Sequence, residues 1–395
     1  MLEQLTALTE DPILGLSQAF AADNNPLKVD LGIGIYRNEQ GKTPIMSAVQ
    51  QAQTLWHQNE QSKSYLPAGG IAGFNSGIAE LLLGREHEAL QAQRIACVQT
   101  PGGCGANRLV AELAQRCKPN ARIWLPNPSW LNHFPLLGSA GLVIAEYPYY
   151  DKVNCTVDFA TMMATLKHAE PGDLVLLHGC CHNPTGADLS REQWQILATE
   201  CRQSKLTPFV DIAYQGLADG LDDDAWGVRH LVEELDEVFL AYSCSKNFGL
   251  YRERVGAVLI AAPNRQLAEI CRSQLISIAR GIYSMPPSHG AAIVDIILHD
   301  PALQASWRNE LNQMRDRIKQ LRETFYRQTK AAGMGEQFAF ITRENGLFSA
   351  LGLTPAQVEQ LKRKYSIYMV NSSRINIAGL NQNNIGYVVQ ALNAL

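Results

Sequence analysis

Three polar residues that accompany apolar runs are the strongest candidates for chemistry in this sequence. Asp211 and Tyr214 belong to the run FVDIAY, and Lys246 comes shortly after the run VFLAYS. A lone lysine next to an apolar strand is most often a solvated loop residue. A lysine in a partly desolvated pocket, however, has a neutral and nucleophilic amine, so these neighbours favour a reactive role.

A glycine-rich turn separates a strand-like run from a helical pattern in QTPGGCGANRLVAELAQRC, residues 99–117. Gly102, Gly103 and Gly105 leave the backbone N–H groups at the start of the helix open, which suits a phosphate. A tight structural turn explains the same glycines. The spacing matches neither G-x-G-x-x-G nor G-x-x-x-x-G-K-[ST], so it disfavours a dinucleotide site or a P-loop.

These groups together match the needs of one cofactor, pyridoxal phosphate. This cofactor requires a reactive lysine, a carboxylate at its ring nitrogen and a cup for its phosphate. Lys246 and Asp211 could supply the first two, and the helix at Gly103 with Ser243 and Arg254 could supply the third. The combination therefore favours a pyridoxal phosphate site over three unrelated features.

The stretch HGCCHNPTG, residues 178–186, admits either a metal site or a turn. Adjacent cysteines after a strand point to opposite faces, and the usual C-x₂₋₄-C spacing of metal sites is missing, so we expect no metal. We expect a strand that ends in a turn and presents the Asn183 amide to a ligand, because ligands gather at the carboxyl ends of strands in open α/β sheets. We also expect cis bonds at Asn183–Pro184 and Asn127–Pro128, where loops must aim a side chain at the ligand.

Short buried strands alternate with helical patterns through the middle of the chain. This alternation predicts an α/β fold with a mainly parallel sheet that helices cover on both faces. One predicted helix, 190–204, has Ser190 as its cap and places Trp194, Leu197 and Cys201 on one face. The runs predicted as strands are VLLH, FVDIAY, VFLAYS and VGAVLIA.

A long helical pattern begins after Pro301 and leads from a large domain into a smaller one. Apolar residues recur in steps of three or four as far as Phe325, which gives one apolar stripe. We expect a large domain over 44–313 and a smaller α+β domain built from 1–43 and 314–395. The elements predicted in the C-terminal part are strands at FAFIT and GLFSAL and helices over 355–364 and 382–394.

The overall composition argues against several classes of function. Lys and Arg number 34 against 38 Asp and Glu, so a net charge of −4 offers no global basic field for nucleic acid or an anionic membrane. The apolar runs are too short for a transmembrane helix, and the N-terminus lacks the pattern of a secretory signal. Nine cysteines, an odd number without disulfide-like spacing, predict reduced thiols in a cytoplasmic protein.

Seven segments in a fixed order resemble the class I aspartate/aromatic aminotransferases over nearly the whole chain. Any one of them is weak support, but seven in order are highly specific. The resemblance implies the fold type I architecture of pyridoxal-phosphate enzymes, with a seven-stranded-type sheet, and a homodimer with shared active sites. The segments are LGIGIYRNEQGKTPI, TPGGCGANR, NPSWLNH, HGCCHNPTG, DIAYQG, SKNFGLYRERVG and SSRINIAG.

The resemblance implies a role for each residue around the cofactor ring. Lys246 corresponds to the lysine that binds the cofactor covalently and carries the proton of the reaction, and Asp211 to the carboxylate that keeps the ring nitrogen protonated. Tyr214 and Asn183 correspond to hydrogen-bond donors to the phenolate oxygen. The residues implied to orient Asp211 and to stack on the ring are His133 and Trp130.

The resemblance also implies a phosphate cup and a substrate pocket. The implied phosphate ligands are Gly103, Cys104, Ser243, Ser245, Arg254 and, from the partner subunit, Tyr65. Cys104 stands where the family usually has Thr or Ser, and a thiol donates a weaker hydrogen bond than a hydroxyl. The implied substrate contacts are Gly34, Trp130, Asn183, Arg374 for the α-carboxylate and, from the partner subunit, Arg280 for a side-chain carboxylate.

The implied activity is transfer of the amino group of aspartate to 2-oxoglutarate by ping-pong chemistry. Aromatic amino acids are a second class of donor that the resemblance allows. Three pocket positions resemble the aspartate-specific branch, namely Ile35, Arg37 and Thr43. Ser64 and Met285 fit neither branch cleanly, so a mainly aromatic aminotransferase is the first alternative. A β-lyase or decarboxylase with the same cofactor is a further alternative, against which Arg280 and Arg374 argue. A non-catalytic ligand-binding protein on the same fold is another, against which the intact candidate catalytic residues argue.

Overall fold

The computed structural model describes residues 2–7 and 12–395, and the chain divides into two compact units. The larger unit comprises Thr43–Arg317 and Glu344–Gly346. The smaller unit comprises Met1–Lys42, Ile318–Arg343 and Leu347–Leu395. The sequence predicts boundaries after residues 43 and 313, and the division of the chain falls after Lys42 and Arg317.

Seven strands form one sheet in the larger unit. Their order is β2-β10-β9-β8-β7-β3-β4, and β10 runs antiparallel to both of its neighbours while the other pairs are parallel. This arrangement confirms the predicted mainly parallel α/β fold. The strands are β2 (Ile95–Pro101), β3 (Arg122–Asn127), β4 (Val143–Pro148), β7 (Leu174–His178), β8 (Thr207–Ile212), β9 (Val238–Ser243) and β10 (Val255–Ala261).

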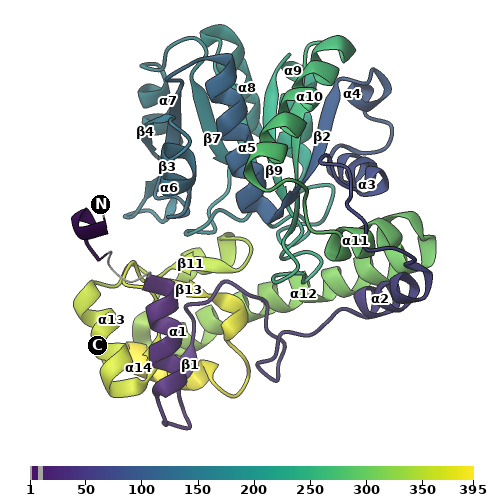
Figure 1. The fold of residues 1–395 in the computed structure, drawn as a ribbon. Helices are drawn as coiled ribbons and strands as arrows, with labels where there is room; N and C mark the ends of the chain where they lie inside the picture. The colour runs from purple at the N-terminus through teal and green to yellow at the C-terminus, as the bar shows by residue number, and fades with distance from the viewer. Residues whose placement is uncertain (1, 8–11) are drawn as a thin grey trace. The chain divides into compact units, whose positions relative to one another are not determined.

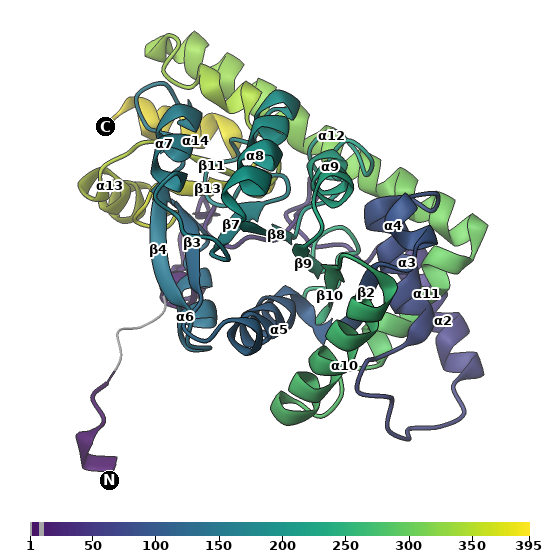
Figure 2. The ribbon, with the colours of Figure 1, turned by 90° about the horizontal axis from the view of Figure 1, so that it is seen from above.

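Helices cover both faces of this sheet, as the views in Figure 1 and Figure 2 show. Helices α5, α6 and α10 lie on one face, and α8 and α9 lie on the other. Strands β9 and β10 are buried along their whole length, which explains why their sequences are continuous apolar runs. The helices of this unit are α2 (Ser47–Asn59), α3 (Ala72–Leu83), α4 (Glu88–Gln91), α5 (Gly102–Cys117), α6 (His133–Gly138), α7 (Phe159–Leu166), α8 (Arg191–Ser204), α9 (Trp226–Glu234), α10 (Arg265–Ile282) and α11 (His289–His299). A hairpin of β5 (Tyr150–Asp151) and β6 (Thr156–Val157) precedes α7.

Helix α8 begins where the sequence predicts. The Ser190 side chain accepts a hydrogen bond from the backbone N–H of Gln193, and the Gln193 side chain accepts one from the backbone N–H of Ser190, which forms a capping box. Trp194, Leu197 and Cys201 are buried, as expected from their spacing. A cap of this kind satisfies backbone donors that would otherwise lack partners in the first turn.

The smaller unit contains both ends of the described chain. Strand β1 pairs in parallel with β12, so Val29 lies opposite Ile367, and this pairing joins the N-terminal segment to the C-terminal part of the chain. The boundary between the units falls inside the long helix α12, which begins at Pro301 as predicted. Its elements are η1 (Leu2–Gln4), α1 (Pro12–Ala22), β1 (Val29–Asp30), the end of α12 (Pro301–Thr329), η2 (Lys330–Met334), η3 (Ala339–Arg343), β11 (Phe348–Ala350), α13 (Pro355–Tyr365), β12 (Ile367–Tyr368), β13 (Arg374–Asn376), η4 (Ile377–Gly379) and α14 (Ile385–Asn393).

The segment FAFIT is not a strand, so that prediction was wrong. It forms most of the 3₁₀ helix η3, Ala339–Arg343. Phe338, Phe340 and Ile341 are all buried, so burial alone does not separate the two structures. The Ile341 N–H donates to the Phe338 carbonyl at 3.2 Å, three residues back in the chain, which is the hydrogen bond of a 3₁₀ helix. Phe338 also packs edge-to-face against Phe325 of α12, with ring centroids 5.7 Å apart.

The carboxyl ends of the parallel strands bring polar residues of the larger unit to one edge. In the register of the sheet, His178 at the end of β7 lies opposite Asp211 of β8. Ser243 at the end of β9 lies opposite Gly256, at the start of the antiparallel β10. Strand β3 ends at Asn127, and the bond to Pro128 is cis, as is Asn183–Pro184, which confirms both expectations.

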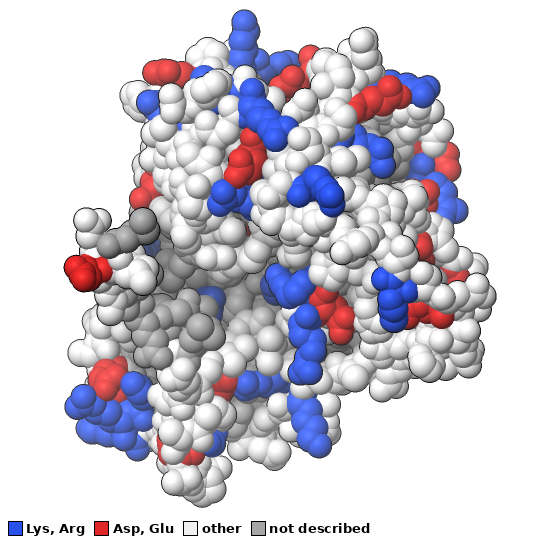
Figure 3. Space-filling view, in the orientation of Figure 1, with Lys and Arg blue, Asp and Glu red and all other residues white. Residues whose placement is uncertain are grey.

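Basic and acidic side chains are interspersed on one face of the molecule. Lysine and arginine side chains alternate with acidic ones on the face that Figure 3 shows. No helix in the described part of the chain combines the length and apolar character needed to cross a bilayer.

Gly256 offers a test of how tightly the strand ends pack. A Cβ at this position would lie 2.6 Å from the backbone carbon of Gly102 and 2.6 Å from the carbonyl oxygen of Tyr242, and neither atom can rotate away. We expect Gly256→Ala to lower the free energy of unfolding by about 3 kcal/mol or more. Gly386→Ala is the control, because its Cβ would have one contact at 3.8 Å, and we expect a change within about 1 kcal/mol. Urea unfolding of both variants would measure this, and equal changes would contradict the close packing.

Candidate active site

Asp211 is the buried carboxylate at the centre of the site. Its Oδ2 accepts a hydrogen bond from His133 Nε2 at 2.8 Å and one from the Asn107 side-chain amide at 3.2 Å. Its Oδ1 accepts no hydrogen bond from the described residues. Burial raises the pKa of Asp211, but the hydrogen bond and charge of His133 and the bond from Asn107 outweigh this, and the net pKa lies below its usual value. The carboxylate is therefore ionised, with one oxygen left for a further partner.

A chain of hydrogen bonds continues from His133 away from the carboxylate. His133 Nδ1 lies 2.9 Å from Ser129 Oγ, which lies 3.2 Å from His178 Nε2. Burial, and then the charge of His133, lower the pKa of His178 to about 3. His178 is thus neutral at physiological pH, and the chain holds the His133 ring with Nε2 directed at Asp211.

The turn at the start of α5 forms a cradle that side chains would fill. Gly102 has a φ of +71°, and a Cβ there would lie 2.4 Å from an Arg254 guanidinium nitrogen. A Cβ on Gly103 would lie 3.1 Å from the Ser243 side chain. The first backbone N–H groups of α5 therefore open toward Ser243 and Arg254, which together with Ser245 suit a phosphate.

Cys104 lies in the first turn of α5, beside this cradle. Burial raises the pKa of its thiol, although the charge of Arg254 and that of Lys246 act in the opposite direction. The Asn132 amide lies 3.8 Å from its sulfur. The side chain is therefore a neutral thiol whose surroundings include the cradle and the candidate catalytic lysine.

Lys246 follows β9 and lies close to Tyr214, which follows β8. Its Nζ is 5.1 Å from the centroid of the Tyr214 ring, and the tyrosine is buried. Trp130 precedes α6, and its ring meets the His133 ring edge-on at 5.1 Å. The charge of Lys246 and that of Asp211 both act on Cys104, so the lysine and the carboxylate flank the same region.

Asn183 lies in the turn that the sequence predicts after β7. The backbone N–H groups of Cys181 and His182, just before it, donate to the two oxygens of Asp188 at 2.9 Å each. The Asn183 N–H reaches His178 Nδ1 at 3.5 Å. Asp188 therefore fixes the path of the backbone that leads to Asn183.

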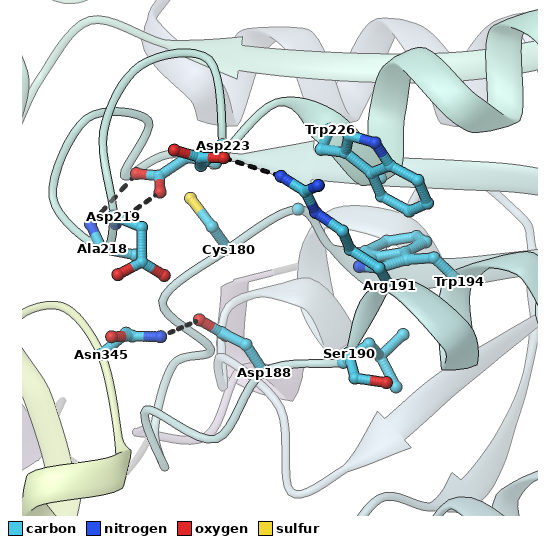
Figure 4. Close-up of a pocket in the computed structure, with 14 residues that line it drawn as sticks. Cys180, Asp188, Ser190, Arg191, Trp194, Ala218, Asp219, Asp223, Trp226 and Asn345 are labelled. Atoms are coloured by element: carbon cyan, nitrogen blue, oxygen red, sulfur yellow. Dashed lines mark hydrogen bonds and ion pairs between the residues drawn. The ribbon is translucent and has the colours of Figure 1, made fainter.

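A cavity of about 460 Å³ lies next to this turn, and Figure 4 shows the residues that line it. Its carboxylates are already engaged. Asp188 also accepts from the Asn345 amide at 3.3 Å, and Asp223 pairs with Arg191 at 2.7 Å. Asp224 accepts four backbone N–H groups from residues 216–220. Asp188 holds the turn before Asn183, and Asp224 holds the turn over residues 216–220. These two carboxylates therefore have a structural role.

Four of the predicted site residues come from segments of the chain other than those described above. Tyr65 is 87% exposed on the larger unit, and Arg280 is exposed in the last turn of α10, where it donates to Ser284 Oγ at 2.6 Å. Arg374 and Gly34 belong to the smaller unit. There the Arg374 guanidinium lies 4.2 Å from the Phe348 ring, and a Cβ on Gly34 would lie 2.6 Å from that ring.

Sequence reasoning missed two side chains that contact the core of the site. Ser129 links two histidines, and its one signal was its place in the segment NPSWLNH. Asn107 donates to Asp211, and its one signal was its position four residues after Gly103, on the same face of α5. His178 was noticed only as a candidate metal ligand. No group of three or more His, Cys, Asp or Glu side chains in the described residues could hold a metal ion.

Comparison with known proteins places this chain in a family. The sequence profile of the family "Aminotransferase class I and II" matches residues 26–392. The chain belongs to this family. This confirms the resemblance that the seven segments carry, and the fold type I architecture with it.

Relatives within the family differ in the amino donor that their names give. The chain is 44% identical over 392 residues to an aspartate aminotransferase of Haemophilus influenzae, with 99% of each chain covered. It is 44% identical over 382 residues to an aromatic-amino-acid aminotransferase of Pseudomonas aeruginosa, covering 97% of this chain and 96% of the other. The crystal structure of an aromatic-amino-acid aminotransferase from Burkholderia pseudomallei, covalently bound to pyridoxal phosphate, matches with a TM-score of 0.98 and 42% identity, covering 100% of this chain and 99% of that one.

The low pKa of His178 makes stability depend on pH. Its folded pKa is about 3 against an ordinary 6.5, so its contribution is fully present above 6.5 and is lost as the pH falls toward 3. Between pH 7 and pH 5 His178 becomes protonated in the unfolded chain but not in the folded protein, which lowers the free energy of unfolding by about 2 kcal/mol. We expect this loss to be roughly 1–2 kcal/mol smaller in His178→Gln, measured by urea unfolding at both pH values.

His57→Gln, at an exposed position of α2, is the control for this measurement and should keep the wild-type loss. A loss that is the same in His178→Gln as in wild type would contradict a His178 that stays neutral in the folded protein.

Proposed function

We propose that this protein is a pyridoxal-phosphate-dependent aminotransferase that moves the amino group of aspartate to 2-oxoglutarate, with aromatic amino acids as a second class of donor. The observation that carries the proposal is the ionised, buried Asp211, held by His133 beside an open glycine turn and Lys246. A carboxylate kept charged in this way matches a protonated ring nitrogen. The names of the relatives support both donor classes.

The residues present fit the cofactor. The turn at Gly102 and Gly103 begins α5 without side chains and lies against Ser243 and Arg254, so it combines a helix start, a hydroxyl and a positive charge that suit a phosphate. Gly103, Cys104, Ser243, Ser245 and Arg254 would hold that phosphate. Trp130 would cover the ring and Asn183 and Tyr214 would donate to its phenolate oxygen.

When bound, pyridoxal phosphate supplies a carbonyl that takes up the donor's amino group and a ring that withdraws electrons from the α-carbon. Lys246 Nζ would hold the cofactor, and its amine would accept and return the proton of the substrate α-carbon. Asp211 Oδ1 would accept a hydrogen bond from the protonated ring nitrogen, while His133 fixes the carboxylate through Oδ2. Tyr214, buried beside Lys246, helps to keep water from the amine.

Two arginines would read the substrate. Arg374 would pair with the α-carboxylate, and its stacking on Phe348 and its bond to the Gly32 carbonyl fix the plane of the guanidinium. Arg280 would pair with the side-chain carboxylate of a dicarboxylic donor in the partner subunit's site. Its exposed position in a single chain supports this role across an interface.

We also propose a homodimer in the cytoplasm. Tyr65 has an apolar ring that is 87% exposed in the single chain, and a C₂ interface would give it and Arg280 a partner in both copies at once. All nine cysteines are free, which supports a reducing compartment.

Covalent attachment at Lys246 is the first test of the proposal. We expect the purified protein to absorb visible light as a pyridoxal chromophore, and borohydride reduction followed by peptide mapping to label Lys246. Addition of aspartate should bleach the colour and 2-oxoglutarate should restore it, because the amino group passes on and off the cofactor. A label on another lysine, or bleaching by aspartate that 2-oxoglutarate does not reverse, would contradict the transaminase mechanism.

Arg280→Ala tests the choice of donor. Loss of a charge-assisted bidentate pair removes roughly 3–5 kcal/mol, so we expect kcat/KM for aspartate to fall by about two to four orders of magnitude. Phenylalanine makes no such pair and should lose much less. An unchanged ratio of the two kcat/KM values would make the protein primarily an aromatic aminotransferase.

Hybrid dimers separate the two sites. Mixing Arg280→Ala subunits with Lys246→Ala subunits leaves one intact site per hybrid only if Arg280 serves the partner subunit. We therefore expect the mixture to regain aspartate activity that neither variant has alone. No recovery, with mixed dimers demonstrated by differently tagged subunits, would place Arg280 in its own subunit's site or outside the site.

A further inference from the structure

We infer that Asn107 is a positioning residue, which holds the Asp211 carboxylate in its charged form and thereby keeps the shared proton on the ring nitrogen of the cofactor. The inference rests on the proposed function, since it concerns the same site. It adds a second donor to the carboxylate besides His133.

The Asn107 amide nitrogen makes two hydrogen bonds. Nδ2 donates to Asp211 Oδ2 at 3.2 Å and to the Gly103 carbonyl at 2.9 Å. Both partners are acceptors without a proton to give, so the amide must present its nitrogen to them and not its oxygen. The orientation of the side chain is therefore fixed by chemistry.

This amide is a costly residue for the fold alone. Asn107 is fully buried, and its Oδ1 has no hydrogen-bond partner among the described residues. The other buried positions of α5 are glycine, alanine, leucine and valine. An apolar residue of similar size would avoid a buried acceptor without a partner. The structural role of the helix therefore does not explain an asparagine here, whereas a bond to a buried charge does.

The two oxygens of Asp211 divide their partners. Oδ2 accepts from His133 at 2.8 Å and from Asn107, while Oδ1 accepts from none of the described residues. Donors to the ionised form stabilise that form, so both bonds lower the proton affinity of the carboxylate. A ring nitrogen that donates to Oδ1 would then keep its proton.

Asn107 also connects the two ends of the proposed cofactor site. Gly103, whose carbonyl accepts the second bond, belongs to the cradle for the phosphate. The amide therefore sets the distance between the first turn of α5 and the end of β8. We expect a change at Asn107 to alter both ring protonation and retention of the cofactor.

The test uses the full-length protein loaded with pyridoxal phosphate that carries ¹⁵N in its ring. The chemical shift of this nitrogen reports directly whether it is protonated, and activity is not needed as a readout. Asn107→Leu removes the donor at similar volume. Asn107→Asp keeps the shape but faces Asp211 with a second carboxyl group, which disfavours the charged form further. The matched control is Asn75→Leu, since Asn75 is a buried helical asparagine whose amide donates to the Gly69 carbonyl at 2.8 Å and is not bonded to Asp211.

We expect a protonated ring nitrogen in wild type and in Asn75→Leu, a shift toward the neutral form in Asn107→Leu, and a larger shift in Asn107→Asp. We also expect the dissociation constant of the cofactor, measured by titration of the cofactor-free protein, to rise roughly tenfold in Asn107→Leu and by less in Asn75→Leu. The spectroscopic order distinguishes a bond to Asp211 from a general loss of packing.

The outcomes separate this inference from the proposed function. A wild-type protein that binds no pyridoxal phosphate would overturn the proposed function and the inference with it. The inference alone would be overturned if the wild-type protein binds the cofactor and the ring nitrogen is as protonated in both Asn107 variants as it is in wild type. A shift of the same size in Asn75→Leu would also overturn it, since the effect would then come from packing.

Discussion

The hydrogen bond between His133 and Asp211 is the interaction on which the rest of the site depends. A carboxylate that is 8% exposed is unstable as an ion unless partners replace the water it has lost. His133 on α6 and Asn107 on α5 provide those partners, and Ser129 with His178 fixes the His133 ring. The sheet must therefore hold four separate segments to within hydrogen-bond distance before the carboxylate can be charged.

The close packing of backbones at the strand ends helps to hold these segments in place. At Gly256 it leaves no room for a side chain. Gly256 of β10 touches the backbone of Gly102 and of Tyr242, so the antiparallel strand, the parallel strand β9 and the glycine turn lock together. The same contact places Ser243 beside Gly103. The pairing of β9 with β10 therefore places Ser243 beside the glycine turn. The contact of Gly256 with Gly102 fixes where α5 begins relative to these strands.

The sequence alone predicts the parts of this arrangement that local patterns determine. The runs VFLAYS and VGAVLIA are strands with the predicted bounds, because a strand buried on both faces needs a continuous apolar run. Ser190 caps α8 because capping depends on residues three apart in the chain. The prediction of a strand at FAFIT was wrong because aromatic residues of this kind are also common in strands. In the structure the segment packs against α12 as a 3₁₀ turn, and the local sequence does not reveal that contact. Asn107 was missed because a polar residue in a helix gives no sign of a buried carboxylate 104 residues away.

The segment TPGGCGANR shows how two residues of one helix can act on opposite ends of a ligand. Cys104 is a neutral thiol, since burial raises its pKa, so it adds no negative charge next to a bound phosphate but offers only a weak donor. Asn107, one turn later, gives a strong donor to a charged oxygen. A hydrogen bond to a charged group is worth about twice a neutral one, so the Asn107 bond stabilises the charge of Asp211 more than a thiol could stabilise an acceptor beside it. At the start of α5 the charge comes from Arg254, which lies against Gly102, so each end of the candidate site has its own charged group.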